Sequence, residues 1–450
     1  MENSLLLDLY ELTMAQSYLT YKRGTLATFD LFVRQLSPHR NYLIACGLED
    51  ILSYIKGLKF SSQDITYLKS LSIFSGDFLE YLKAFRFRGD IWAMPEGTVF
   101  FANEPVLRVT APVIQAQIIE GFLLNTFNLQ TMIASKASRV VTQAKGRGLF
   151  DFSLRRTHGP QAGLKVSRSS YIAGFDATSC VLAGKTYKIP VAGTMAHSLI
   201  MTFNEEMDSF LAYANSFPSR TVLLVDTYDI KKGIENAIKI GLYLKEKGFR
   251  LQGIRLDSGD IAVLSKLARK MLDKAGLRYV KIFASGNLDE YKIKELLDKK
   301  ACVDSFGVGT NMGTSIDAPC LDVIYKLCEV TDEEGEFLPV MKLSKAKHTY
   351  PGRKQVFRIK DKKGRFLKDI VALENEQING IPLLKKVVGC GKIVYKSPGL
   401  NITRLLVKTQ LSGFDKKLFR IDIKYNYPVV ISPRLKALRI QLSRQLKRKQ

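Results

Sequence analysis

Hydrophobic and polar positions near the start of the chain follow first a helical and then a strand-like period. Residues 3–20 carry apolar side chains at helical spacing, which predicts a helix that buries Leu6, Tyr10 and Met14. Residues 27–36 alternate apolar and polar side chains, as a half-buried strand does. The chain therefore opens with a helix followed by a strand.

The next hundred residues continue this mixture of elements. Helix start signals occur at residues 61–64 (SSQD) and 75–78 (SGDF). Residues 89–112 read as a series of short strands with Pro and Gly turns, and residues 113–147 are largely helical. The pattern predicts an α+β domain over residues 1–148.

From residue 149 short apolar runs alternate with helical patterns. Such alternation is typical of βαβ units and predicts a parallel sheet. At least six strands in succession predict an irregular α/β barrel over residues 149–340. The strand runs are LFDFSL, IPVAGT (189–194), TVLLVD (221–226), RLQGIRLD (250–257), YVKIFASG (279–286) and VDSFGVGT (303–310), and helices are expected over 230–246, 260–275 and 288–299.

Short strands separated by Gly and Pro turns return after residue 340. The expected strand segments are FRIKDKKGRFLKDIV, ITRLLVK and KKLFRIDIKYNYPVVIS, and the final LKALRIQLSRQLKRKQ reads as an amphipathic basic helix. Residues 341–450 form either a third domain or a part of the first one. The fold class is thus α/β, with a barrel and an α+β domain.

The net charge of +25 is concentrated in this last region. Residues 341–450 hold 28 Lys and Arg against 6 Asp and Glu, a net charge of +22. Contact with nucleic acid or anionic lipid is one interpretation, and a solvated charged surface is the other. The second is favoured, because the basic residues are interspersed with strand-like runs and lack an ordered set of stacking aromatic residues. Neither nucleic acid nor a membrane is expected as a partner.

Cysteine usage and the N-terminus bear on the cell compartment. The six cysteines are scattered without a CxxC pair, which favours reduced, buried thiols over disulfides or metal ligands. The N-terminus lacks a basic region followed by an apolar stretch, so no secretory signal is expected. No apolar run approaches the roughly 18 residues that span a bilayer. The expected location is the cytoplasm.

Polar residues follow the strand that ends near residue 256. In a parallel α/β barrel the active site lies at the carboxyl ends of the strands. Arg255 and Asp257 alternate along the strand and therefore share one face. Asp257 could accept hydrogen bonds from ribose hydroxyls, hold a divalent cation or supply a charge at a helix start, which Asp260 could do alone. Arg255 needs an anionic partner, either Asp257 or a ligand carboxylate.

The two following strand ends carry glycine, hydroxyl and amide residues. Loops of this composition present backbone N–H groups to an anion. The alternative is that they are turns and helix caps, since Ser258 and Asn287 are good N-cap residues. Taken together, the strand ends favour a phosphate site. The residues concerned are Ser285, Gly286 and Asn287 in the first loop and Gly307, Gly309, Thr310 and Asn311 in the second.

The segment 150–198 combines aromatic, basic and histidine side chains. Arg155, with Arg156 beside it, follows a strand and matches a planar carboxylate or a phosphate. Phe152 could stack on a flat ring, as could Tyr10 far upstream, but core packing is favoured for each alone. For His197, spacing alone favours a structural role, and a phosphoryl-accepting nucleophile is the alternative.

At these residues the chain closely resembles the nicotinate phosphoribosyltransferases. The resemblance covers most of the chain in ordered blocks and weakens beyond about residue 355. The blocks are DLYELTMAQSY (8–18), FDLFVRQLSPHRNYLIACGLEDIL (29–52), MPEGTVFFANEPVLRV, RRTHGP, GFDATSCVLAGK, GTMAHS, DTYD, RLDSGD, SGNLDE and FGVGT. The resemblance implies an enzyme that joins nicotinate to 5-phosphoribosyl 1-diphosphate, forming nicotinate mononucleotide and diphosphate in NAD salvage.

The resemblance also implies roles for individual residues. It makes His197 a transient phosphohistidine through which ATP hydrolysis is coupled to the transfer. It makes Arg255 and Asp257 catalytic residues. Arg255 is a candidate to bind the nicotinate carboxylate, and Asp257 is a candidate to bind the ribose diol. The implied substrate-binding residues are the ring-stacking pair Tyr10 and Phe152, with Arg155, Thr194, Ser285, Gly286, Asn287, Gly307, Gly309 and Thr310.

Cofactors and assembly are implied in the same way. Mg²⁺ is expected, held mainly through the diphosphate with no protein ligand assigned, and ATP is the expected co-substrate. The family's active sites form at a head-to-tail dimer interface, so a homodimer with shared sites is expected, where Arg34 or Arg40 reaches a neighbour's diphosphate. The family fold combines an α/β barrel with an α+β domain built from both chain ends.

Two other functions compete with this one. The first is a phosphoribosyltransferase acting on nicotinamide or quinolinate. A cation suits the nicotinate carboxylate, whereas an amide favours an acceptor such as Asp, so Arg155 and Arg255 favour nicotinate. The second is a basic nucleic-acid-binding protein that has lost catalysis, against which the intact RLDSGD, SGN and GTMAHS motifs argue.

Overall fold

The computed structural model describes residues 4–38, 40–343 and 349–448. They divide into two compact units. Unit 1 combines residues 1–132 with residues 320–450, and unit 2 comprises residues 133–319. Both chain ends thus belong to one unit. The domain boundaries expected near residues 148 and 340 stay a prediction, and the compact units change at earlier positions.

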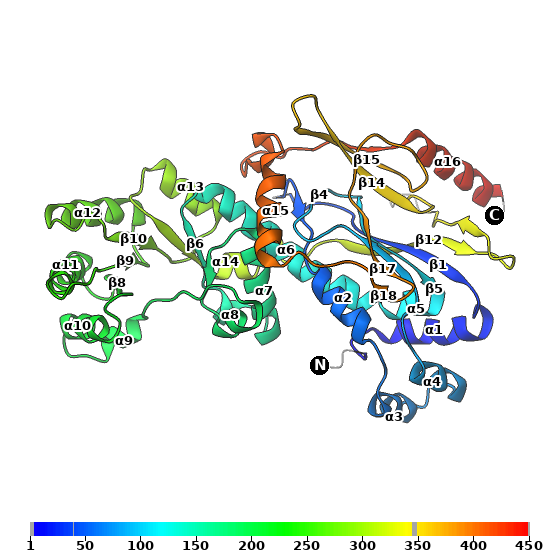
Figure 1. The fold of residues 1–450 in the computed structure, drawn as a ribbon, viewed down its shortest axis with the longest axis horizontal. Coiled ribbons are helices and arrows are strands. Elements are labelled where there is room, and N and C mark those ends of the chain that lie inside the picture. Colours follow the sequence, from blue (N-terminus) through cyan, green and yellow to red (C-terminus); the bar gives the residue numbers. More distant parts are fainter. Residues whose placement is uncertain (1–3, 39, 344–348, 449–450) are drawn as a thin grey trace. The chain divides into compact units, whose positions relative to one another are not determined.

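A seven-stranded antiparallel sheet is the centre of unit 1. Its strand order is β13-β12-β1-β5-β3-β17-β18. In Figure 1 the blue strand β1 lies beside the yellow strand β12, with Ala27 opposite Val330. The strands are β1 (Leu26–Val33), β3 (Asp90–Ala93), β5 (Pro105–Pro112), β12 (Val323–Thr331), β13 (Phe337–Pro339), β17 (Lys385–Gly389) and β18 (Lys392–Ile393).

Helices and two smaller sheets complete unit 1. β2 (Leu43–Ile44) pairs with β4 (Val99–Phe100), and a four-stranded sheet has the order β16-β14-β15-β19. Its strands are β14 (Lys354–Lys360), β15 (Phe366–Leu373), β16 (Ile381–Pro382) and β19 (Val429–Ile431). The helices are α1 (Leu9–Tyr21), α2 (Leu48–Gly57), α3 (Ser62–Ser70), α4 (Gly76–Lys83), α5 (Val113–Ile118), α15 (Leu400–Ser412), the 3-10 helix η2 (Lys416–Phe419) and α16 (Pro433–Arg448), and α6 (Glu120–Ala144) runs from unit 1 into unit 2.

The helix starts expected from the sequence are confirmed. Ser61 caps α3 in a reciprocal capping box with Asp64, and the Ser75 hydroxyl accepts the Phe78 N–H at the start of α4. Each side-chain oxygen satisfies a backbone donor that has no partner within its helix. The short strands of residues 89–112 and the final basic helix are also present, and α16 ends at Arg448, since residues 449–450 lie outside the described part.

The buried face expected for the first helix is wrong. Leu6, Tyr10 and Met14 are 55%, 46% and 36% exposed, and α1 instead buries Glu11, Leu12 and Ala15. Helical periodicity identifies an apolar stripe but not the neighbour that covers it. Here α1 packs against α5, and this contact selects the opposite side of the helix.

Four expected strands also differ. Of residues 416–432 only Val429–Ile431 form a strand, β19, and Lys416–Phe419 form the 3-10 helix η2. Residues 402–408 belong to helix α15, which buries Thr403 and Val407 at i, i+4 spacing. A short apolar run fits either a strand or a helix, and packing decides. Residues 189–194 contribute only one parallel bridge, Thr178 to Val191. β1 is buried from Ala27 to Val33 rather than alternating, as a strand covered on both faces is.

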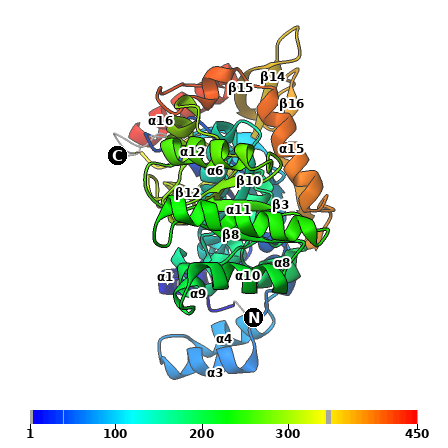
Figure 2. The same cartoon turned by 90° about the vertical axis from the view of Figure 1, so that its left-hand side faces the viewer.

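Unit 2 is built on six parallel strands in the order β7-β6-β11-β10-β9-β8. Figure 2 shows α10, α11 and α12 in front of β8 and β10, so these helices cover the sheet from outside. The strands are β6 (Gly148–Asp151), β7 (Ala177–Thr178), β8 (Val222–Leu224), β9 (Gly253–Leu256), β10 (Lys281–Ala284) and β11 (Ser305–Val308).

The helices of unit 2 follow the strands in chain order. They are η1 (Leu154–Arg156), α7 (Pro160–Ala173), α8 (Val181–Tyr187), α9 (His197–Met201), α10 (Glu206–Ser216), α11 (Ile230–Glu246), α12 (Ile261–Lys274), α13 (Glu290–Asp298) and α14 (Thr310–Gly313). The expected α/β class with a parallel sheet is confirmed. In the part of the chain that the structure describes, no ladder joins β7 to β8.

None of the helices in the described ranges is long and apolar enough to cross a membrane.

Candidate active site

Arg255 projects from the end of β9 toward the segment that precedes α9. Its Nη1 donates to the Thr194 hydroxyl at 2.5 Å and to the Met195 carbonyl at 3.0 Å. Its Nη2 lies 3.8 Å from Oδ1 of Asp257, and its buried Nε has no hydrogen-bond partner among the described residues. A buried donor without a partner is unfavourable. Arg255 therefore keeps hydrogen-bonding capacity that the described residues do not use.

The charge state of Arg255 reflects the same surroundings. Burial lowers the pKa of its guanidinium, and the nearby cation Arg155 lowers it further. The carboxylates of Asp257 and Asp226 act in the opposite direction. Arg155 is itself exposed in η1, beside the exposed Arg156. Two interacting cations that follow two strands of one sheet favour a ligand with a negative charge.

Asp257 is held from two neighbouring strands. Its Oδ1 accepts a hydrogen bond of 2.5 Å from the hydroxyl of Ser285, which follows β10. Its backbone N–H donates to Oδ2 of Asp226, which lies just beyond β8, at 2.8 Å. The Ser258 hydroxyl donates to the same oxygen at 2.7 Å. Strands β8, β9 and β10 thus meet through side chains at their carboxyl ends.

Asp226 is a site residue that the sequence reasoning did not single out. It is nearly buried, and its Oδ1 has no hydrogen-bond partner within the described residues. The signal was present in the sequence, because Asp226 ends the run TVLLVD just as Asp257 ends the run GIRLD. Their position at the end of an apolar strand run would have identified Asp226 as readily as Asp257.

The loop after β10 requires glycine. Gly286 has a φ of +94°, and a Cβ there would lie 2.0 Å from the Asp257 carbonyl oxygen. Such a position excludes every other residue type. Asn287 also has a positive φ, of 48°. The Asn311 side chain, on α14, donates to the Asn287 carbonyl at 3.2 Å, which joins this loop to the one after β11.

The helix-cap interpretation of Ser258 and Asn287 is wrong. Asp260 caps α12 by accepting from the Ala262 and Val263 N–H groups, and Asp289 caps α13. Ser258 and Asn287 therefore lie in the strand-end loops without a capping task.

Phe152 lies across the loop after β11. A Cβ on Gly307 would come within 2.8 Å of the Phe152 ring and 2.9 Å of the Phe283 ring. The two rings are tilted, with centroids 5.6 Å apart. The backbone of Phe152 approaches Gly309 and bonds to Val308 at 2.9 Å. Phe152 is half-buried, so part of its side chain reaches the surface and can meet a flat ligand.

Asp151 fixes the segment that carries Phe152. This fully buried carboxylate accepts hydrogen bonds from the Ser153 backbone and hydroxyl and from the hydroxyls of Ser167 and Thr178. Four hydrogen-bond donors hold this carboxylate in one orientation. The sequence reasoning did not identify Asp151, because its partners come from separate elements.

His197 is the first residue of α9. Its Nδ1 lies 3.1 Å from the Thr227 hydroxyl, one residue beyond Asp226. The imidazole is half-buried. A bond at Nδ1 orients the ring and leaves Nε2 for other chemistry. His197 therefore lies at the same strand end as Asp226, and Thr194, three residues earlier, contacts Arg255.

Three expected site residues belong to unit 1. Tyr10 lies on α1, where burial and the nearby Glu120 carboxylate raise the pKa of its phenol. Arg34 forms an ion pair of 3.3 Å with Asp322. Arg40 is buried within the unit. Unit 2 by itself brings together the other residues expected at the strand ends.

The described residues contain no group of three or more His, Cys, Asp or Glu side chains arranged to hold a metal ion.

A parallel sheet with arginine, aspartate, histidine and glycine loops at its carboxyl ends is typical of an α/β enzyme. Residues 5–128 match the nicotinate phosphoribosyltransferase N-terminal domain, and residues 148–369 match the nicotinate phosphoribosyltransferase family. The chain belongs to the nicotinate phosphoribosyltransferase family.

Individual relatives agree with this assignment. A nicotinate phosphoribosyltransferase of Mycobacterium tuberculosis is 44% identical over 434 residues, covering 96% of this chain and 92% of the relative. The Bacillus subtilis nicotinate phosphoribosyltransferase is 37% identical, and the match covers 95% of this chain and 93% of the relative. The structure of human nicotinic acid phosphoribosyltransferase is similar with a TM-score of 0.87, at 29% identity, covering 97% of this chain and 99% of that one.

Proposed function

We propose that this chain transfers the phosphoribosyl group of 5-phosphoribosyl 1-diphosphate to nicotinate. The observation that carries the proposal is the buried Arg255, whose Nε lacks a partner, beside Asp257 at the end of β9. The arginine suits the nicotinate carboxylate, and the aspartate suits the ribose diol. The family membership of the chain supports the same reaction.

The reaction requires little proton transfer from the protein. The ring nitrogen of nicotinate forms a bond to C1 of the ribose, and the bond from C1 to the diphosphate oxygen breaks. The diphosphate leaves with the bonding electrons, so the transition state has an oxocarbenium-like ribose. Asp257, held by Ser285 and Asp226, orients the ribose hydroxyls. Phe152 and Tyr10 are the proposed ring platforms, and the loops 285–287 and 307–310 receive the 5-phosphate.

ATP is the proposed co-substrate, and His197 is its proposed phosphoryl acceptor. The contact of Nδ1 with Thr227 supports this role, because it orients the ring with Nε2 directed away from that contact. In the step, Nε2 forms a bond to the γ-phosphorus of ATP, and ADP leaves. The phosphohistidine adds negative charge at the strand end before it is hydrolysed.

Mg²⁺ is the proposed metal ion, and it would neutralise the diphosphate charge. The ion would be carried mainly by the diphosphate of the substrate. Asp226 can add one ligand, since its Oδ1 is buried without a partner. We further propose a homodimer with shared sites and a cytoplasmic location, for which six cysteines without a disulfide bond are suitable.

A panel of three bases tests the proposed function. The purified full-length chain is incubated with 5-phosphoribosyl 1-diphosphate, ATP and Mg²⁺, and with nicotinate, nicotinamide or quinolinate. We expect nicotinate mononucleotide as the main product, measured by liquid chromatography with mass detection. A preference for nicotinamide or quinolinate would overturn the proposal.

Phosphorylation is tested on the same protein. Incubation with ATP should add one phosphate to a peptide containing His197, detected at alkaline pH, where phosphohistidine survives. The His197→Ala variant should lose ATP stimulation and keep a slow transfer without ATP. Undiminished ATP stimulation in this variant would exclude the phosphohistidine role.

A further inference from the structure

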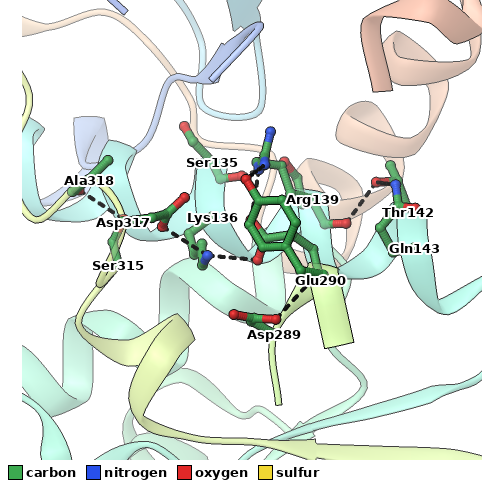
Figure 3. Close-up of polar contacts among 12 residues, drawn as sticks. Ser135, Lys136, Arg139, Thr142, Gln143, Asp289, Glu290, Ser315, Asp317 and Ala318 are labelled. Atoms are coloured by element: carbon green, nitrogen blue, oxygen red, sulfur yellow. Dashed lines mark hydrogen bonds and ion pairs between the residues drawn. The ribbon is translucent and has the colours of Figure 1, made fainter. Parts of the chain in front are cut away.

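Lys136 is a fully buried lysine in the part of α6 that belongs to unit 2. Figure 3 shows its ammonium group between two carboxylates. Its Nζ lies 2.7 Å from Oε2 of Glu290 and 2.8 Å from Oδ1 of Asp317. Arg139, nearly one turn further along α6, lies 2.8 Å from Oε1 of Glu290 through its Nε. The cluster holds two cations and two carboxylates and has no formal net charge.

The carboxylates of this cluster follow the two strand-end loops in the sequence. Glu290 is the first residue of α13 and follows the loop 285–287 by three residues. Asp317 comes shortly after α14, which begins at Thr310 in the loop after β11. The same lysine therefore pairs with one carboxylate downstream of each loop. The hydrogen bond from Asn311 to Asn287 joins them a second time, nearer the surface.

Stability alone does not account for such a cluster. Removing ions from water costs several kcal/mol each, and apolar replacements of buried ion pairs are often neutral or stabilising. A buried ion pair does, however, fix the separation of the elements that supply its charges. A phosphate bound between two loops needs its hydrogen-bond donors at one set of distances. A misplacement of these groups by about 1 Å strongly lowers the reaction rate.

We propose that Lys136 is a positioning residue for the 5-phosphate of the ribose substrate. Through Glu290 and Asp317 it sets the separation of the loops 285–287 and 307–310. The proposal rests on the proposed function in that it takes these loops as the phosphate site. Lys136 itself is buried beneath them and does not touch the substrate.

The test replaces one cation and one carboxylate together, so that the cluster keeps its neutrality. The variant Lys136→Met/Asp317→Asn leaves the Glu290–Arg139 pair in place. We expect the KM for 5-phosphoribosyl 1-diphosphate to rise about tenfold, while kcat and the KM for nicotinate change less than about twofold. A merely structural role would lower the melting temperature without this selective effect.

A matched control exists in unit 1. Lys354 and Asp30 form another buried Lys–Asp pair, at 2.7 Å, and neither residue belongs to the strand-end loops. The variant Lys354→Met/Asp30→Asn should lose comparable thermal stability and keep the wild-type KM. Equal changes of this KM in the two double variants, or none in the Lys136 variant, would overturn the proposal.

Two further measurements keep the outcomes distinct. If the double variant does not fold, Asp317→Asn alone, which retains the Lys136–Glu290 pair, should raise the same KM about threefold, and an unchanged KM would reject the proposal. Calorimetric binding of 5-phosphoribosyl 1-diphosphate to the wild-type chain and to the Lys136 variant tests the positioning role separately from the proposed reaction with nicotinate. Wild-type binding that weakens in the Lys136 variant supports the positioning role even if the preferred base is not nicotinate.

Discussion

Asp226 holds Asp257 in place across two adjacent parallel strands. Oδ2 of Asp226 accepts the backbone N–H of Asp257 at 2.8 Å. The same oxygen accepts the neighbouring Ser258 hydroxyl at 2.7 Å, and Oδ1 stays without a partner among the described residues. One carboxylate thus fixes the loop that presents another.

Removal of the Asp226 carboxylate should therefore disable the loop. Asp226→Ala takes away both hydrogen bonds, and we expect kcat/KM to fall about 10- to 100-fold. Asp226→Asn keeps an oxygen acceptor and separates orientation from charge. If kcat/KM falls in Asp226→Ala but is largely restored in Asp226→Asn, the carboxylate acts by orienting the loop. Equal falls of kcat/KM in both variants would show that its charge matters. Steady-state kinetics with wild-type activity in Asp226→Ala would contradict the assignment.

The Ser285 hydroxyl orients Asp257 from the other side. Ser285→Ala removes the hydrogen bond to Oδ1. A hydrogen bond to a charged group contributes about 1.5 kcal/mol, so the KM for 5-phosphoribosyl 1-diphosphate should rise roughly tenfold. Ser209→Ala removes another buried serine hydroxyl, whose hydrogen bond goes to the Glu206 carbonyl, and serves as control. Identical KM values in the two variants would argue against the role of Ser285.

Gly286 is expected to be irreplaceable for two separable reasons. Gly286→Ala adds both the strain of a positive φ and a contact of 2.0 Å with the Asp257 carbonyl. Gly248 has a φ of +78° and nothing within 4 Å of an added Cβ, so Gly248→Ala tests the strain alone. The control should lose about 1 kcal/mol of unfolding free energy. Gly286→Ala should lose roughly 3 kcal/mol together with activity, measured by denaturant titration and assay.

Glu11 gives unit 1 a pH-dependent stability. Burial, followed by repulsion from Glu120, raises the pKa of its carboxyl from 4.5 to about 8. Between pH 4.5 and about 8, Glu11 therefore keeps a proton in the folded chain that it has lost in the unfolded chain. Over this range the unfolding free energy falls as the pH rises.

Glu11→Gln keeps the side chain neutral at every pH and removes this dependence. At pH 9 the variant should be more stable than wild type by about 1–3 kcal/mol, and near pH 5 the two should be similar. Thermal unfolding at both values provides the measurement. A stability difference that does not change with pH would show that Glu11 is not the titrating group.

Much of unit 2 could be predicted from the sequence, because its signals are local. The helix expected over 230–246 is α11, and β9, β10 and β11 lie within the expected strand runs. Arg255 and Asp257 share a strand face, and their side chains approach to 3.8 Å. A strand followed by polar residues and a helix carries its own pattern, independent of distant neighbours.

The sequence could not reveal what depends on distant partners. Lys136 reads as one polar residue of a long helix, and only the folded chain brings Glu290 and Asp317 to it. The same holds for Asp151, two of whose donors come from α7 and β7. On α1, the contact with α5 decided which residues are buried. Tertiary packing, rather than local preference, sets each of these features.

The discontinuity of unit 1 imposes an order on folding during synthesis. β1 lies between β5 and β12, and its pairing of Ala27 with Val330 spans just over three hundred residues. Residues 133–319 leave the ribosome as one uninterrupted segment and can fold before that pairing becomes available. Until β12 emerges, one edge of β1 is open to the strands of other nascent chains. A slow translation rate between residues 112 and 323 would therefore lengthen the interval in which this chain is prone to aggregation.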